Sequence, residues 1–157
     1  MENMSINNPT QPSDFSKVTT YQAGVKQAAM HRNLQKHCDL ILNNYGIRKM
    51  QWLIVGTVLD SGKKGVRLTE LAITLGTTMA YITTAVNMLE SKGMLVRKDH
   101  QTDSRSKLIS IDPKFVPMCK VIEKALREGL RETIYAKIDP HEFLVYMKVM
   151  YQLAAED

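Results

Sequence analysis

Two groups of side chains in the middle of this sequence have the chemistry to recognise a nucleic acid. Hydroxyl and amide groups can bond phosphates or base edges, methyl groups can lie against a thymine methyl, and loop cations can neutralise phosphates. The first group falls on one predicted helix and its entry turn: Thr77, Thr78, Met79, Ala80, Tyr81, Thr83, Thr84 and Asn87. The second falls in and beside a polar loop: Lys98, Asp103, Arg105 and Lys107. Together they predict an interface for double-stranded DNA.

The elements around these residues predict a helix-turn-helix followed by a wing. A short amphipathic helix over 69–75 ends at Gly76, and a longer helix over 79–91 ends before Gly93, since glycine tolerates the left-handed geometry of a helix end. Two short apolar runs then flank the charged loop, as the strands of a hairpin do. A helix-turn-helix presents its second helix to a major groove. The positions expected to point inward are Leu71, Leu75, Ile82, Ala85, Val86 and Leu89.

These motifs resemble the multiple antibiotic resistance regulator (MarR) family of winged helix-turn-helix transcription factors. The similarity runs through LTELA and LG at 68–76, through LESKG at 89–93 followed by Leu95, and through the Asp103-x-Arg105 pair. The resemblance implies that Arg105 reaches into the minor groove while Asp103 holds the loop or orients that arginine. The alternative is that Asp103 and Arg105 only join the two sides of the hairpin. The resemblance also implies a two-fold dimer on a pseudo-palindromic operator. A small aromatic or phenolic effector would then bind between the helical dimer region and the winged domain.

The second helix departs from the family pattern in its charge. Members commonly carry a cation on the exposed face of this helix, whereas this sequence has no Lys or Arg between Gly76 and Lys92. Asn87 could still bond an adenine through both of its polar atoms. Without an Arg–guanine contact, we expect direct readout to be weak or to favour A·T pairs. The wing and the shape of the DNA would then supply more of the affinity.

The distribution of charge supports a polyanion-binding surface in the same segment. Residues 47–112 carry ten Lys and Arg against six acids, within a chain whose net charge is +5. The flanking segments nearly balance, with four against three in 1–46 and seven against seven in 113–157. A DNA-binding surface would produce this asymmetry, although a solvated surface that is merely basic would produce it too.

Long helices on either side of this segment predict a dimerisation region. The N-terminal helix, with Ser13 or Asp14 as its expected N-cap, is too long for one small domain to cover. A helix over 114–137 and a last, strongly apolar helix over 141–155 are joined at the Asp139-Pro140 pair. The last helix is too apolar to be left exposed, so we expect it in a dimer interface. The family resemblance implies that the first helix packs with the last two and with those of a second copy.

The predicted fold class is therefore mainly α with a small β wing (α+β). It is a winged helix-turn-helix with long N- and C-terminal dimerisation helices. We interpret residues 1–13, which include two prolines, as a mobile N-terminal arm. Residues 14–45 and 113–157 form the helical dimerisation region, and residues 46–112 form the DNA-binding domain.

Enzymatic and metal-binding functions have little support in the sequence. It contains no serine elbow, phosphate-binding glycine loop or paired-carboxylate motif, so we predict no enzyme and no cofactor. His31, His37 and Cys38 share a helix without the spacing of metal ligands, so we predict no metal site. We interpret Cys38 as a small core residue, with a peroxide-sensing thiol as the alternative.

The sequence thus predicts a dimeric, sequence-specific DNA-binding transcriptional regulator, a repressor relieved by a small-molecule ligand. Neither a secretory signal nor an apolar stretch of membrane length occurs, so we expect no membrane partner and a cytoplasmic location. The alternative is a winged-helix module that docks a protein and has lost DNA binding. The uncharged second helix favours this alternative, and the Asp103-x-Arg105 wing opposes it.

Overall fold

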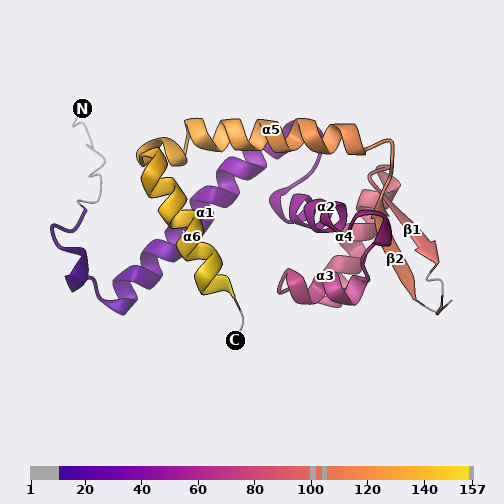
Figure 1. Cartoon of the computed structure of the whole chain (residues 1–157), viewed down its shortest axis with the longest axis horizontal. Coiled ribbons are helices and arrows are strands. Elements are labelled where there is room, and N and C mark those ends of the chain that lie inside the picture. The colour runs from indigo at the N-terminus through magenta and orange to yellow at the C-terminus, as the bar shows by residue number, and fades with distance from the viewer. Residues whose placement is uncertain (1–10, 100–101, 104–105, 156–157) are drawn as a thin grey trace, which may run out of the picture.

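The computed structural model describes residues 11–99, 102–103 and 106–155, so most of the expected arm over 1–13 lies outside the described residues. Its helices gather at the two ends of α5 (Val116–Glu132), which runs along one side of the molecule (Figure 1). One end holds α1 (Thr20–Leu42) and α6 (Pro140–Ala154). The other end holds, in chain order, α2 (Lys49–Asp60), α3 (Leu68–Thr74), α4 (Met79–Ser91), β1 (Leu95–Asp99) and β2 (Lys107–Ile111). The predicted mainly α fold with a small β wing is confirmed.

A glycine turn and a threonine cap join α3 to α4. Gly76 takes a φ of 60° after the end of α3, and the backbone N–H of Thr77 donates to the Ala72 carbonyl at 3.0 Å. The hydroxyl of Thr78 accepts from the backbone N–H of Tyr81 at 3.2 Å, which caps α4. Such a cap contributes about 1 kcal/mol. The turn therefore has the expected form, with α3 over 68–74 instead of 69–75.

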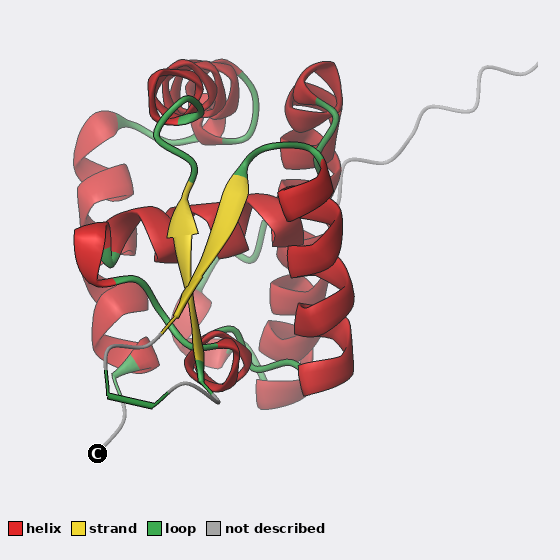
Figure 2. Ribbon diagram, turned by 90° about the vertical axis from the view of Figure 1, so that its right-hand side faces the viewer, coloured by secondary structure: helices red, strands yellow, loops and turns green. Residues whose placement is uncertain are grey.

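The wing has the two strands that the sequence predicts and one isolated bridge that it does not. β1 and β2 pair antiparallel, with Leu95 opposite Ile111, and Figure 2 shows them side by side in front of helices. Val66 adds an isolated antiparallel bridge to Ile109 on the other edge of β2. The N–H of each of these two residues donates to the carbonyl of the other, at 2.9 and 2.8 Å. The bridge ties the chain just before α3 to the wing.

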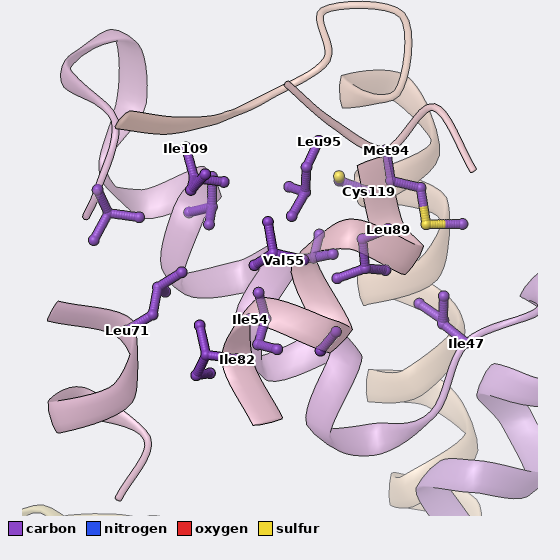
Figure 3. Packing of buried hydrophobic residues seen from close by; sticks show 14 of the residues in the cluster. Ile47, Ile54, Val55, Leu71, Ile82, Leu89, Met94, Leu95, Ile109 and Cys119 are labelled. Carbon is purple, nitrogen blue, oxygen red and sulfur yellow. The ribbon is translucent and has the colours of Figure 1, made fainter. Parts of the chain in front are cut away.

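Apolar side chains from α2, α3, α4, the wing and α5 meet in one core (Figure 3). Burying each large aliphatic side chain of this kind contributes about 1.5–3 kcal/mol. Five of the six expected inward positions are buried, and Leu75 is partly buried against the same core. The fully buried side chains here include Ile54, Val55, Leu71, Ile82, Val86, Leu89, Leu95, Ile109 and Ile122. This packing fixes which face of α4 points outward.

Two local features join α1 to its neighbours. A Cβ built at Gly129 of α5 would lie only 2.6 Å from Cδ1 of Ile41 in α1, so glycine permits a close approach of the two helices. The carboxylate of Asp39 in α1 accepts from the backbone N–H of Lys49 at 2.6 Å, at the first residue of α2. An acceptor at this end of a helix satisfies an otherwise unpaired N–H. The carboxylate therefore links α1 directly to the start of α2.

Two expected helix boundaries are wrong. Asp14 caps only a short 3-10 turn over Phe15–Lys17, and α1 begins after Thr19, which forms a capping box with Gln22. Val18 is extended between them, so the two helical segments are separate. α5 covers 116–132 instead of 114–137, because the backbone leaves helical geometry at Thr133.

The last helix has little of its surface covered within this chain. Asp139 and Pro140 start α6 as expected, and its first turns lie near Tyr135, whose ring centroid is 4.8 Å from that of Phe143. None of the α6 residues is buried. The exposed large apolar side chains on it are Leu144, Val145, Val149, Met150, Tyr151 and Leu153. In the described part of the chain, no helix is long and apolar enough to cross a membrane.

Substituting Gly65 should destabilise the wing. This residue has a φ of 75° and a ψ of 178°, and an added Cβ would lie 2.9 Å from the Ile109 carbonyl oxygen. We expect Gly65→Ala to lower the free energy of unfolding by about 3 kcal/mol, since it combines backbone strain with overpacking. Gly62→Ala is the matched control, because Gly62 has a φ of 58° in open space and should lose about 1 kcal/mol. Equal losses in urea unfolding would contradict the close approach at Gly65.

Candidate nucleic-acid interface

The outward stripe of α4 is set by the residues that the core buries. Ile82, Val86 and Leu89 face inward, and at 100° per residue the opposite side of the helix carries Ala80, Thr84 and Asn87. These three positions are exposed. The structure therefore brings three of the eight residues predicted on this helix and its entry turn onto one face. Met79 and Tyr81, at 42% and 43% exposure, flank it near the start of the helix.

The threonine hydroxyls differ in what they can offer to DNA. Thr83 and Thr84 donate to the carbonyls of Met79 and Ala80, at 2.8 and 3.0 Å, so their hydroxyl protons are in use. A phosphate only accepts, so these two side chains must rotate before they can bond one. The Thr78 oxygen accepts from the Tyr81 N–H, which leaves its proton for a phosphate. Thr77, in the turn, is only partly exposed.

Asn87 is held by an arginine that the sequence analysis did not include among the candidate site residues. The guanidinium of Arg97, on β1, donates through Nη2 to Oδ1 of Asn87. Its Nε lies 3.5 Å from Oε2 of Glu90, one turn along α4. The exposed face of α4 therefore has a cation beside it after all, supplied by the neighbouring strand. The alternation of side chains along β1 could have indicated this position, because Arg97 lies two residues from the buried Leu95 and so shares its face of the sheet.

The wing residues from the sequence analysis lie in different settings. Lys98 is exposed on the opposite face of β1 from Arg97. Lys107 forms an ion pair with Asp99 across the hairpin, and both side chains are exposed. Asp103 is exposed in the loop, where its carbonyl accepts from the backbone N–H of Ser106 at 3.0 Å. Arg105, to which the family resemblance assigns the minor-groove contact, lies outside the described residues.

A pocket of about 370 Å³ lies beside the other flank of α4, between that helix and the junction of α1 with α2. The Lys92 ammonium donates to the Gly46 carbonyl, and the Gln51 amide donates to the sulfur of Met88 at 3.0 Å. Two cations and several apolar groups line the space, a combination that suits an aromatic anion. The lining residues are Asn43, Gly46, Ile47, Arg48, Gln51, Tyr81, Thr84, Ala85, Met88 and Lys92.

Cys38 has the environment of an unreactive thiol. It is 7% exposed, and burial raises its pKa more than the nearby Lys49 lowers it. A sensing cysteine needs a stabilised thiolate, so these surroundings favour the small core residue over the peroxide sensor. In the part of the chain that the structure describes, no group of three or more His, Cys, Asp or Glu side chains is placed to hold a metal ion.

Comparisons with known proteins show which fold this chain shares. No protein-family model and no curated protein matches the sequence. Solved structures are similar: wild-type MarR from E. coli in its apo form has a TM-score of 0.74 at 14% identity, over 84% of this chain and 96% of that one. A MarR family transcriptional regulator from Streptomyces coelicolor, in complex with DNA, has a TM-score of 0.73 at 19% identity, over 87% and 91%.

A third similar structure holds a ligand. CouR from Rhodococcus jostii, bound to p-coumaroyl-CoA, has a TM-score of 0.72 at 18% identity, over 90% of this chain and 94% of that one. Identities this low show a shared fold, and each match spans nearly the whole length of both chains. The chain therefore has the winged helix-turn-helix fold of the MarR-type regulators, including the helices that flank the winged segment.

Proposed function

We propose that this chain is a dimeric, sequence-specific DNA-binding transcriptional regulator of the MarR type, a repressor relieved by a small molecule. The observation that carries the proposal is the outward face of α4, which exposes Ala80, Thr84 and Asn87 while its inner face is fixed in the core. A similar structure from Streptomyces coelicolor is a complex with DNA, which supports the same use of this fold. We propose no enzymatic activity for this chain. Because its proposed partner is double-stranded DNA, we expect the protein in the cytoplasm.

The chemistry of each segment indicates its role in binding DNA or in dimerisation. Thr78 and Tyr81 at the start of α4 can bond phosphates, where the backbone N–H groups of a helix also favour an anion. Lys98 and Arg105 in the wing segment are the cations expected on the DNA backbone and in the minor groove. Residues 46–112 would therefore hold the DNA, and segments 14–45 and 113–157 would hold the two copies together.

The first prediction from this proposed function concerns salt. Binding to the protein's own promoter fragment should weaken steeply with salt and resist unrelated competitor DNA. Each phosphate contact adds about 0.9 to the slope of log K against log salt. We expect Lys98→Ala to lower that slope by about 1 and Arg105→Ala to weaken binding. Lys124→Ala, on the exposed side of α5, is the matched control and should leave both the slope and the affinity unchanged.

The same titration separates this proposal from a protein-docking winged helix. A docking module would fail to bind any DNA fragment, even at low salt. Binding that vanishes with competitor would mean that only the basic surface is active. Either result for the unaltered chain would contradict sequence-specific regulation.

The second prediction concerns the dimer. Leu144 of α6 is 66% exposed in the single chain, among other exposed apolar side chains of that helix. A charge at such a position cannot be buried without a large desolvation cost. We therefore expect Leu144→Glu to halve the mass measured by sedimentation, with an unchanged circular dichroism spectrum. Lys63→Glu makes a similar change of charge at an exposed position outside the proposed dimerisation helices and should leave the dimer intact. A monomeric unaltered chain would contradict the proposal.

The third prediction concerns the effector. The pocket beside α4 combines Arg48 and Lys92 with apolar walls, and CouR is a structural neighbour bound to a phenolic acyl-CoA. We expect p-coumarate, used as a probe, to lower DNA affinity about 5- to 150-fold, the usual size of such coupling. Arg48→Met should weaken the probe without changing DNA affinity in its absence. Lys120→Met, on α5, is the control. If the probe binds without changing DNA affinity, the result would contradict a regulatory role for the pocket.

A further inference from the structure

We propose that Arg97 and Asn87 act as one base-reading pair that presents only hydrogen-bond donors, and that it favours guanine over adenine. This inference rests on the proposed function, since it names the specificity of the same helix. It differs from the sequence-based expectation, in which Asn87 alone reads an adenine and α4 lacks a cation.

The position of Arg97 is fixed by the packing of β1. Side chains alternate along a strand, so Arg97 shares a face with Leu95, which is 1% exposed in the core. Arg97 also lies opposite Ile109, which is fully buried. The arginine therefore leaves the sheet on its inner side, beyond the edge of the core, where α4 passes. Its side chain is 32% exposed, so the guanidinium is neither buried nor fully solvated.

The contacts of the guanidinium determine the orientation of the Asn87 amide. A guanidinium carries five N–H donors and no acceptor, so the Asn87 atom that faces it must be the carbonyl oxygen Oδ1. Glu90 steadies the guanidinium from the next turn of α4, with Oε2 at 3.5 Å from Nε. The amide nitrogen of Asn87 is consequently directed away from Arg97. The usual ambiguity between the two amide atoms does not arise here.

This orientation disfavours adenine. To read adenine with both polar atoms, an asparagine accepts from the N6 amino group through Oδ1 and donates to N7. Here Oδ1 already accepts a hydrogen bond from the Arg97 guanidinium. An adenine amino group that approached the same oxygen would also face the remaining N–H groups of the guanidinium, and two donors cannot bond each other. The free Asn87 NH2 and those N–H groups are all donors. Guanine offers two adjacent acceptors in the major groove, N7 and O6, and suits such a pair.

Selection of tight binders from a random duplex library tests the pair. For the unaltered protein we expect guanine at one position of each half-site, preferred about tenfold over adenine. Arg97→Met keeps much of the side-chain volume and frees Asn87, so the preference at that position should shift to adenine. Arg97→Lys retains a donor toward Oδ1 and should retain the guanine preference. Asn87→Ala should weaken the guanine preference, because one of the two donor groups is lost, and Arg97→Met in that background should abolish what remains.

Controls separate specificity from folding and from plain charge. Lys98→Met removes the neighbouring cation on the opposite face of β1 and should reduce affinity while leaving every base preference unchanged. Thermal unfolding of each variant identifies loss of the fold. If Arg97→Met selects the same bases as the unaltered protein, or if Asn87→Ala changes no base preference, the inference is overturned. If the unaltered protein selects no sequence at all, the proposed function itself fails.

Discussion

Burial of one side of α4 constrains every residue that this helix could present to DNA. Ile82, Val86 and Leu89 pack into a core shared with α2 and the wing. At about 1.5–3 kcal/mol for each buried side chain, that packing far outweighs any single exposed contact. The packing of these side chains in the core therefore fixes the rotation of α4 about its own axis. The outward stripe through Ala80 and Asn87 follows from it, whatever those residues are.

Polar contacts then connect this fixed helix to the parts of the chain around it. Arg97 reaches it from the wing, Lys92 bonds the Gly46 carbonyl at the end of the α1–α2 junction, and Gln51 of α2 bonds Met88. Asp39 joins that junction to α1 through the first N–H of α2. A change in the separation of the long helices would therefore reach α4 through short, identifiable links, and the pocket lies among them. This geometry gives a physical route by which a ligand could bias DNA binding.

The sequence predicts the local features of this fold well, because local features depend on residues close together along the chain. The period of the apolar residues places α4 within its observed bounds, and Gly76 and Thr78 form the expected turn and cap. Pairings between distant segments leave no such periodic signal. The bridge from Val66 to Ile109 and the contact of Gly129 with Ile41 each join segments more than forty residues apart, and only the folded chain reveals them. The Arg97–Asn87 contact joins residues only ten apart, but it depends on how β1 packs beside α4, which the sequence analysis did not predict.

That contact changes how the charge of the recognition surface should be understood. Counting cations along α4 suggests a helix that can read bases only weakly, since none lies between Gly76 and Lys92. A cation on the adjacent strand serves the same face, because hydrogen-bond donors act through their position in space and not through their place in the sequence. Its partner Glu90 prevents it from swinging freely, which lowers the entropy cost of ordering a long side chain at an interface. The lack of charge along α4 therefore argues only weakly against DNA binding.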